Sequence, residues 1–363
     1  MATSQHNLRI ALLGCGGVGG TLAGHLALSE AEFAVVTHNP EIEQRLRAHG
    51  LVLREGRHLL RQRVRAVVSL DELEGQFDLI FLAMQPPQLE EAVIQARSRL
   101  RPGGAFVVFQ NGLCEQRVAA LVGAERVIGA IVAWGASMIE PGVYERTSAG
   151  GFTVGTLDGS AHPLLPALCR YLERVGPVQQ TRNLLGARWS KLAINCAISS
   201  LGTIGGERLG VLLRYRFARR LGLEVITECV EVAQANGVQL EKVAGTLDLQ
   251  WVALSVAERW QQGSPSLLAK HALLLAVGAR FRKLRSSMLA AIERGREPAI
   301  DFLNGEVVRH GTTVGVPTPL NQRVVAIVHR IARGELQPSL RTLHRLYLET
   351  MPLRSAAGQQ PSP

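Results

Sequence analysis

Two short patterns in this sequence contain residues whose types and spacing could carry chemistry. The first is a G-x-G-x-x-G motif, Gly14, Gly16 and Gly19, directly after the apolar run Ile10 to Leu13. Glycines at this spacing let the backbone approach a pyrophosphate, and the N-terminus of the following helix stabilises its charge. A lone motif is weak evidence, but here a predicted strand precedes it and a predicted helix follows. The pattern therefore predicts a dinucleotide site made by Gly14, Cys15, Gly16, Gly17, Val18 and Gly19.

The second pattern is a polar stripe around a lysine. This arginine-rich chain has lysine only at Lys191, Lys242, Lys270 and Lys283. A spacing of four places Lys191, Asn195 and Ser199 on one face of a predicted, otherwise apolar helix. An amine can act as an acid at a reacting centre, whereas a guanidinium holds its proton too tightly. The alternative interpretation of the stripe is a solvated helix face.

The residues after the second predicted strand indicate which dinucleotide is bound. An acidic residue there would hold the ribose hydroxyls of NAD, whereas a neutral or basic residue leaves room for the 2'-phosphate of NADP. This chain has Thr37, His38 and Asn39, with Arg45 and Arg47 a few residues further on. The sequence favours NADP (NADPH), with His38 and Asn39 beside the phosphate.

These patterns require a fold that places them. As far as about Thr181, short β-branched runs alternate with helical segments, which is typical of a mostly parallel sheet covered by helices. The predicted strands are 10–13, 34–37, 79–83, 105–109 and 127–133, then hairpin-like segments at 142–147 and 151–155 and a short strand at 177–180. From Asn183 onward, apolar residues recur at helical spacing. The predicted helices are 184–204, 216–235, 240–261, 266–293, 301–314 and 319–331, the last capped by Thr318.

The fold class is therefore an α/β Rossmann-type doubly wound domain followed by an all-α C-terminal domain. We expect the Rossmann domain at 1–182, the helical catalytic domain at 183–350 and a disordered tail at 351–363. The substrate should bind in the cleft between the two domains.

Composition excludes several other classes of protein. Hydrophobic residues make up 47% of the 363 residues and charged residues 19%, so the chain can bury large cores without a metal or disulfide. Five scattered cysteines without C-x-x-C spacing argue against a zinc site and favour a reducing, cytoplasmic location. No apolar run is long enough to span a membrane. The formal charge is +10, but the arginines are dispersed and only 5% of residues are aromatic, which argues against a nucleic-acid partner.

Three further stretches resemble the ketopantoate reductase family. They are Gln110-Asn111-Gly112 after a predicted strand, Trp189-Ser190-Lys191-Leu192-Ala193-Ile194-Asn195, and Ser286-Ser287-Met288-Leu289 with Glu293 to Asp301 and Asn304-Gly305. With the glycine motif, they span the chain from Ile10 to about Ile331. Thr318-Pro319 and Asn321 also fit the family's closing helix, although capping that helix is their simpler role.

The resemblance implies roles for individual residues. Lys191 would donate a proton to the carbonyl oxygen of a 2-keto acid, and Asn195 would orient that oxygen. Ser287 would bind the carboxylate, Ser199 would add a donor, and Asn111 would lie beside the nicotinamide ribose. The implied reaction is NADPH-dependent reduction of a 2-keto acid to a 2-hydroxy acid, as for ketopantoate to pantoate. A homodimer is one option for the assembly.

Three departures from the family pattern leave the substrate open. A family glutamate is Ala299 here, a phosphate-contacting lysine is Gln85, and the second asparagine of the catalytic helix is Ser199. The segment from about 240 to 284 is also longer than in compact members. An opine- or imine-type reductase and a non-catalytic dinucleotide sensor are therefore the alternatives, and consumption of NADPH with a keto acid would distinguish an enzyme from a sensor.

Overall fold

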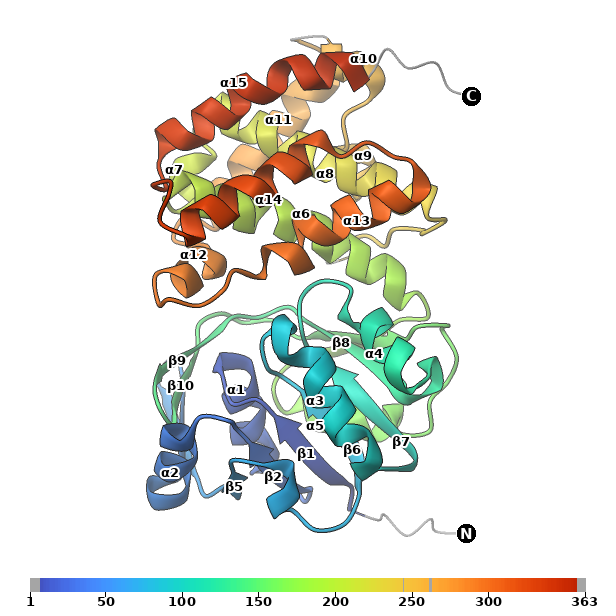
Figure 1. Cartoon of the computed structure of the whole chain (residues 1–363), viewed down its shortest axis with the longest axis vertical. Helices are drawn as coiled ribbons and strands as arrows, with labels where there is room; N and C mark the ends of the chain where they lie inside the picture. The colour runs from blue at the N-terminus through green and yellow to red at the C-terminus, as the bar shows by residue number, and fades with distance from the viewer. Residues whose placement is uncertain (1–6, 244, 261–262, 358–363) are drawn as a thin grey trace. The chain divides into compact units, whose positions relative to one another are not determined.

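The computed structural model describes residues 7–243, 245–260 and 263–357 of the chain. It divides into two compact units, Met1–Leu184 and Leu185–Pro363, and each is described by itself (Figure 1).

The first unit is built on an eight-stranded sheet with the strand order β12-β11-β8-β7-β6-β1-β2-β5. Neighbouring strands are parallel except β11, which runs antiparallel to β8. The strands of this sheet are β1 (Arg9–Leu13), β2 (Glu32–Val36), β5 (Ala66–Val67), β6 (Phe77–Leu82), β7 (Leu100–Val108), β8 (Val127–Val132), β11 (Phe152–Thr156) and β12 (Val178–Gln180). Buried aliphatic runs fill its central strands, as expected for strands covered on both faces.

The order of the first six strands defines the site edge. From β1 the chain moves outward through β2 to β5, then crosses back to β6 and continues through β7 and β8. The strand order therefore reverses between β1 and β6, and ligands of doubly wound sheets bind at the carboxyl ends of strands at such a reversal. Helices that connect the strands cover the sheet, as expected for a mostly parallel sheet. These helices are α1 (Gly17–Leu26), α2 (Pro40–His49), α3 (Leu89–Ala96), α4 (Cys114–Val122) and α5 (Leu165–Glu173).

A second, four-stranded sheet lies against α1. Its order is β4-β3-β10-β9, formed by β3 (Leu51–Glu55), β4 (His58–Gln62), β9 (Ala136–Glu140) and β10 (Val143–Arg146). The face of α1 toward it is glycine: a Cβ at Gly17 would lie 2.6 Å from the Ala136 carbonyl oxygen, and one at Gly20 would overlap the Tyr144 ring. The glycine-rich start of α1 therefore permits close packing against this sheet as well as the turn after β1.

The predicted fold class is confirmed, but the strand predictions were incomplete. Each strand predicted for the main sheet is present, with ends shifted by a few residues. The hairpin-like segment 142–147 does form a hairpin, β9 with β10, whereas 151–155 is β11 of the main sheet. The prediction missed β3, β4, β5 and β9, which are short or largely polar.

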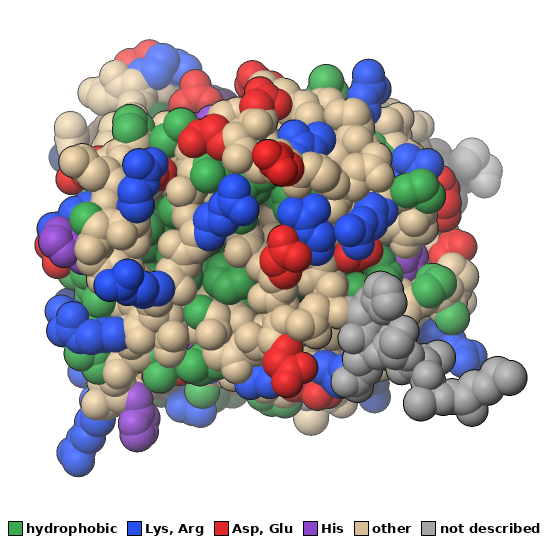
Figure 2. Space-filling model, turned by 90° about the horizontal axis from the view of Figure 1, so that it is seen from below, with side chains coloured by type: hydrophobic (Ala, Val, Ile, Leu, Met, Phe, Trp, Pro, Cys, Tyr) green, Lys and Arg blue, Asp and Glu red, His purple; other side chains and the backbone are tan. Residues whose placement is uncertain are grey.

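Charged side chains are mixed on the face of the molecule shown in Figure 2. Lys and Arg side chains lie there among Asp and Glu side chains and apolar ones, without gathering into a single stripe. This arrangement is that of solvated charges on an ordinary surface.

Helices are the main regular elements in the described part of the second unit, which also has one isolated bridge between Val243 and Leu247. Its helices are α6 (Leu184–Gly205, beginning at the boundary), α7 (Leu209–Leu212), α8 (Arg216–Ala235), α9 (Leu249–Val252), α10 (Val256–Trp260), α11 (Pro265–Arg280), α12 (Ser287–Ile292), α13 (Asn304–Val314), α14 (Pro319–Ala332) and α15 (Leu340–Ala357). Helix α8 is buried along most of its length and contacts α9, α11, α13, α14 and α15. It is the central helix of this unit (Figure 1).

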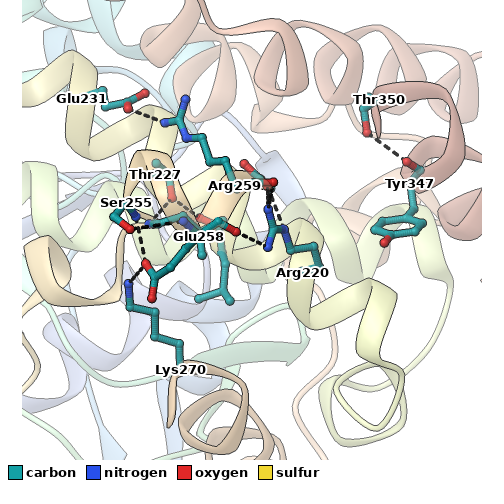
Figure 3. Close-up of polar contacts among 12 residues, drawn as sticks. Arg220, Thr227, Glu231, Ser255, Glu258, Arg259, Lys270, Tyr347 and Thr350 are labelled. Carbon is teal, nitrogen blue, oxygen red and sulfur yellow. Dashed lines mark hydrogen bonds and ion pairs between the residues drawn. The ribbon is translucent and has the colours of Figure 1, made fainter. Parts of the chain in front are cut away.

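The predicted helix 240–261 is wrong. Its described residues 240–243 and 245–248 are not helical, residues 249–260 form only the short helices α9 and α10, and residues 244 and 261 lie outside the described residues. Buried polar contacts hold it: Lys270 Nζ donates to Glu258 Oε2 at 2.5 Å and to the Ala253 carbonyl at 2.7 Å, and Thr227 Oγ1 accepts the Leu254 N–H. Figure 3 shows Lys270, Glu258, Ser255 and Thr227 converging at this turn. These contacts replace helical hydrogen bonds, so the segment's apolar spacing did not become a helix.

Two further helix predictions and the prediction of a disordered tail need correction. The predicted helix 266–293 is broken into α11 and α12, with Ser286 capping α12. The helix predicted from Asp301 begins at Asn304, because residues 299–302 form a 3-10 turn. The tail predicted as disordered from residue 351 continues α15 as far as Ala357, and residues 358–363 lie outside the described residues.

The Thr318 prediction is also wrong in its chemistry. Thr318 occupies the N-cap position of α14, but its side chain makes no capping bond. Instead Glu228, 92 residues earlier on α8, accepts the Leu320 N–H at 2.8 Å and the Asn321 N–H at 2.9 Å. The carboxyl group of a residue on another helix thus caps α14.

Candidate active site

The carboxyl edge of β1, β6 and β7 gathers the residues predicted to bind a dinucleotide. Gly14 follows β1, Gln85 follows β6 and Asn111 follows β7. Backbone bonds hold the three strand ends in register: the Ala83 N–H donates to the Leu13 carbonyl at 2.8 Å and the Phe109 N–H to the Leu82 carbonyl at 3.2 Å. The structure therefore brings the ends of these three strands to one edge at the reversal of strand order.

Packing within the protein requires glycine at two positions of the motif but not at the third. Gly14 has φ +97°, and a Cβ there would lie 2.6 Å from the Met84 nitrogen. A Cβ at Gly19 would overlap the Gly14 carbonyl oxygen. At Gly16, by contrast, a Cβ would meet nothing within 4 Å among the described residues. The packing therefore explains Gly14 and Gly19, while the open space at Gly16 fits a ligand that approaches the backbone.

The start of α1 fits an anionic group as well. Gly16 is the N-cap of α1, and no side chain caps the helix. The N–H groups of a first helical turn need acceptors, and a phosphate is a suitable one. The residues present therefore fit the pyrophosphate of a dinucleotide.

Tyr144 supports the glycine loop from the second sheet, a contact that the sequence did not predict. Its hydroxyl donates to the Cys15 carbonyl at 3.1 Å, and the Cys15 thiol lies 3.0 Å from the same hydroxyl oxygen. Both side chains are buried, and burial raises the pKa of Cys15 to about 12 in spite of the Tyr144 hydrogen bond. Cys15 is thus a neutral packing residue of the loop. Its backbone, held by Tyr144, is the part that can face a ligand.

The loops after β6 and β7 are joined by Gln110. Its side-chain amide donates to the Met84 carbonyl at 3.2 Å. The next residue, Asn111, is exposed, as is Gln85 at the start of the loop after β6. Gly112 has φ +94°, which turns the chain toward α4. Gln110 therefore holds two exposed polar side chains on neighbouring loops at the same edge.

After β2, His38 and Asn39 take different positions. The Asn39 side-chain oxygen caps α2, accepting the N–H groups of Glu41 at 2.9 Å and Ile42 at 3.4 Å. His38 is exposed, and Arg47 is paired with Glu43 on α2. The turn therefore offers an imidazole and an amide, but no carboxylate immediately after the strand.

In the second unit, the predicted polar stripe lies on α6. Lys191, Asn195 and Ser199 are half-buried, whereas the intervening Leu192 and Cys196 are buried. At 1.5 Å per residue, Lys191 and Ser199 are about 12 Å apart along the helix. The three residues thus form a row between the buried and accessible sides of α6.

The neighbours of Lys191 are fixed by packing. Trp189 is almost fully buried, with its ring edge-to-face against His310 at 5.3 Å between centroids. Ser190 is buried and donates to the Glu241 carbonyl at 2.6 Å. Because the residues on either side are anchored, the backbone that carries Lys191 has little freedom.

Helix α12 is held to the Ser199 end of α6 by Ser286. The Ser286 hydroxyl donates to the Ser199 carbonyl at 2.9 Å, lies 2.8 Å from Thr203 Oγ1 and accepts the Leu289 N–H. Ser287, the predicted substrate ligand, is the next residue and is exposed. Ser286 therefore has a positioning role that the sequence did not assign, although a serine three residues before an apolar helix position is a recognisable cap.

Asn304 and Asn321, by contrast, belong to the core. Both are fully buried. Asn304 donates to Asn321 Oδ1 at 2.8 Å, and Asn321 donates to Glu228 Oε2 at 2.6 Å. This chain of hydrogen bonds joins α8, α13 and α14, so it explains both asparagines without a substrate. Asp301 lies apart, exposed and 3.0 Å from His329 Nε2.

The described residues lack two features, a cluster of metal ligands and a membrane-spanning helix. They hold no group of three or more His, Cys, Asp and Glu side chains that could bind a metal ion. Nor do they include a helix both long and apolar enough to cross a membrane.

A doubly wound sheet with a glycine loop at its strand reversal, followed by a helical unit with the polar row Lys191, Asn195 and Ser199, is the arrangement expected of a Rossmann-type oxidoreductase. Comparison with known families agrees. The family described as ketopantoate reductase PanE/ApbA matches residues 10–159, and its C-terminal counterpart matches residues 183–332. The chain belongs to the ketopantoate reductase family.

Individual relatives are distant but cover nearly the whole chain. A 2-dehydropantoate 2-reductase from Pyrococcus horikoshii is 25% identical over 323 residues, which cover 88% of this chain and 96% of the relative. One from Mesorhizobium japonicum is 24% identical over 348 residues, covering 90% and 98%.

Solved structures share the fold. A ketopantoate reductase from Ralstonia eutropha superposes with a TM-score of 0.75 at 24% identity, covering 90% of this chain and 99% of the other. D-mandelate dehydrogenase with NADH and anilino(oxo)acetate superposes with a TM-score of 0.76 at 20% identity and the same coverage. At these identities the similarity establishes the fold alone, and family membership makes the protein an oxidoreductase that uses a pyridine nucleotide.

Proposed function

We propose that this protein reduces a 2-keto acid to a 2-hydroxy acid with NADPH, and that ketopantoate is the first substrate to test. The observation that carries the proposal is the row Lys191, Asn195 and Ser199 on α6 in a chain whose first unit has an open glycine loop. The curated relatives are named for this reaction, which supports the choice of substrate class.

The dinucleotide would lie along the carboxyl edge of β1. Residues 14–19 would hold the pyrophosphate, His38 and Asn39 the 2'-phosphate, and Gln85 and Asn111 the nicotinamide half. When bound, the reduced nicotinamide supplies the hydride.

The residues of the second unit would supply the rest of the chemistry. As negative charge develops on the carbonyl oxygen, the Lys191 ammonium stabilises it and donates a proton from Nζ. Asn195 orients the same oxygen or a neighbouring hydroxyl. Ser287 donates to the carboxylate, and Ser199 adds a donor near Ser287, because Ser286 bonds to the Ser199 carbonyl.

NADPH should be preferred to NADH. No carboxylate follows β2 directly, so nothing there repels a 2'-phosphate, and the exposed imidazole of His38 can donate to it. Dissociation constants for the two cofactors, measured by fluorescence titration, decide this prediction. Tighter binding of NADH would contradict it.

The substrate is best tested with a panel. Purified protein is mixed with NADPH and ketopantoate, pyruvate, branched 2-keto acids or an aryl 2-keto acid, and oxidation of NADPH is followed by absorbance. The aryl acid belongs in the panel because one similar fold is a D-mandelate dehydrogenase. An imine-forming mixture of a keto acid and an amine tests the alternative chemistry. We expect the highest kcat/KM with ketopantoate, and a protein that binds NADPH but reduces no keto acid would contradict the proposal.

A further inference from the structure

A cationic pocket in the second unit has no role in the reaction proposed above. Its volume is about 530 Å³, and it is formed where α7 and α11 meet the chain segment between α11 and α12. The charged residues that line it are Arg208, Arg214, Arg282 and Lys283, and no acidic residue lines it.

The four cations have no carboxylate partner in the part of the chain that the structure describes. Among the described residues, none of them forms an ion pair, although neighbouring Arg285 pairs with Glu293 at 2.5 Å. Four like charges around one pocket repel one another, and an anionic ligand would relieve this repulsion. The chain thus concentrates positive charge at this pocket without neutralising it internally.

The backbone positions of these cations are fixed. A Cβ at Gly210 would lie 2.7 Å from the Arg282 Cα, so α7 and the 281–286 segment are in close contact. The Leu209 N–H also donates to the Leu284 carbonyl at 2.9 Å. On α11, a Cβ at Gly278 would lie 2.9 Å from the Leu213 Cβ. The pocket is therefore framed by packed backbone, and only the ends of the cationic side chains remain to be ordered by a ligand.

Further arginines lie near the N-terminal half of α11. His271, one to two turns before the pocket residues of α11, has its pKa lowered to about 4, first by burial and then by the charges of Arg219, Arg216 and Arg220. Positive charge therefore extends beyond the four lining residues, although Arg220 is itself paired with Glu224.

We propose that this pocket binds a small, soluble molecule that carries at least two phosphate groups, held by Arg208, Arg214, Arg282 and Lys283. Three guanidiniums can each take a phosphate in a forked, two-bond arrangement, and the ammonium adds a point charge. A single phosphate would contact only part of a ring of four cations, whereas a chain of phosphates could reach all of them. The volume is also in the range of small-molecule sites.

Binding of a ligand in this pocket should affect the proposed substrate site. Lys283 is four residues before Ser287, and between them Leu284 is bonded to α7 and Ser286 to α6. A ligand that holds Arg282 and Lys283 would steady the segment that positions Ser287. This effect on keto acid affinity depends on the proposed function, but the binding itself does not.

Binding is measured by calorimetry with inorganic tripolyphosphate and the full chain at low salt. The double variant Arg214→Glu/Arg282→Glu removes two of the lining cations. Its matched control is Arg57→Glu/Arg61→Glu, which changes the formal charge equally at two exposed positions of the first unit. We expect one site per chain, weakened at least about ten-fold in the pocket variant and less than about two-fold in the control.

A third variant separates the pocket from the dinucleotide loop. Gly16→Val should leave tripolyphosphate binding intact if the pocket is the site. Loss of binding in Gly16→Val, equal loss in both charge variants, or no binding to wild type would each overturn the proposal. A further outcome would also overturn it: tripolyphosphate does not bind, but anionic phosphatidylglycerol vesicles or single-stranded RNA bind in a way that depends on Arg214 and Arg282. If the proposed function also holds, tripolyphosphate should lower the KM for the keto acid in wild type and leave the pocket variant unchanged.

Discussion

Lys191 is the residue on which the proposed chemistry depends most. It lies between anchored neighbours on α6, with Ser190 bonded to the Glu241 carbonyl. If its amine donates the proton, Lys191→Ala should lower kcat by about 10²- to 10⁴-fold, or roughly 3 to 5 kcal/mol of barrier. Affinity for NADPH should change little, because the glycine loop belongs to the other unit. Steady-state kinetics with the best keto acid of the panel and a cofactor titration measure the two effects.

Two companion variants sharpen the Lys191 test. Lys191→Arg keeps the charge but should restore little activity, because a guanidinium does not release its proton readily. Asn195→Ala should have a smaller effect and be non-additive with Lys191→Ala, since both would act on one oxygen. A folded Lys191→Ala protein that turns over at the wild-type rate would make Lys191 a surface amine.

A substitution at Gly16 tests the proposed cofactor site by adding one side chain. A side chain there meets no described protein atom within 4 Å, so Gly16→Val should fold, with a loss near 1 kcal/mol from the poorer cap. It should nevertheless reduce NADPH affinity by at least about 100-fold, because the side chain occupies the approach of the pyrophosphate. Gly14→Val is the contrast: its Cβ would lie 2.6 Å from the Met84 nitrogen, so it should lower the melting temperature itself. Cofactor affinity retained in folded Gly16→Val would place the dinucleotide elsewhere.

At the scale of elements, the predictable parts were those that short sequence stretches determine. The strand, glycine turn and helix around Gly14 depend on neighbours in sequence, and α8 was predicted with its observed bounds, 216–235. Its apolar positions recur along 20 residues, because it packs against helices on several sides. The pattern Leu51-Val52-Leu53 before Glu55-Gly56 also signalled the β3–β4 hairpin, but it was not recognised.

The unpredicted parts depend on contacts between distant residues. The segment 240–261 has helical spacing, yet Glu258 bonds to Lys270 on α11 and Leu254 to Thr227 on α8. Helix α14 is capped by Glu228 instead of the adjacent Thr318. In the candidate site, the support of Cys15 by Tyr144 joins residues 129 positions apart. No local sequence pattern indicates such pairs, although each contact is easily explained once the packing of the elements is known.

The Glu228 cap makes a prediction about pH. Burial raises the pKa of Glu228 from 4.5 to about 7, against the opposing effect of hydrogen bonds from Asn321 and Leu320. The native carboxyl therefore still holds its proton between about pH 4.5 and 7, where the unfolded chain has lost it. The contribution of this group to the free energy of unfolding should then fall as pH rises through that window, by at most about 3 kcal/mol.

Glu228→Gln isolates that contribution, because glutamine does not titrate. Urea unfolding of wild type and variant from pH 4 to pH 8 gives the difference in stability at each pH. The advantage of wild type over the variant should shrink as pH rises from about 4.5 to 7 and then level off. If the free energies of unfolding of wild type and variant run parallel across this pH range, Glu228 does not titrate in this window.

On the scale of the whole molecule, the fold does not determine the substrate. Solved structures that share this fold include a ketopantoate reductase and D-mandelate dehydrogenase. We therefore expect the substrate to be decided by side chains of the predicted site, such as Ala299, Gln85 and Ser199, where the sequence differs from the pattern that the resemblance implies.

Net charge is a property of the whole chain with a kinetic consequence. The formal charge is +10, while a keto acid and the phosphates of a dinucleotide are anionic. Their long-range attraction should raise the rate of encounter, and salt should weaken it, because the screening length falls from about 10 Å at 0.1 M to about 3 Å at 1 M. We expect kcat/KM for the keto acid to fall about three- to ten-fold between 0.05 and 0.5 M KCl. Turnover at saturating substrate should change less than about two-fold, since contacts inside a binding site are screened little.

The double variant Arg57→Glu/Arg61→Glu lowers the formal charge by four at exposed positions of the β3–β4 hairpin, so it should reduce the salt dependence without changing kcat. If kcat/KM stays constant across this salt range, the positive charge serves only solubility, and substrate capture depends on short-range contacts alone.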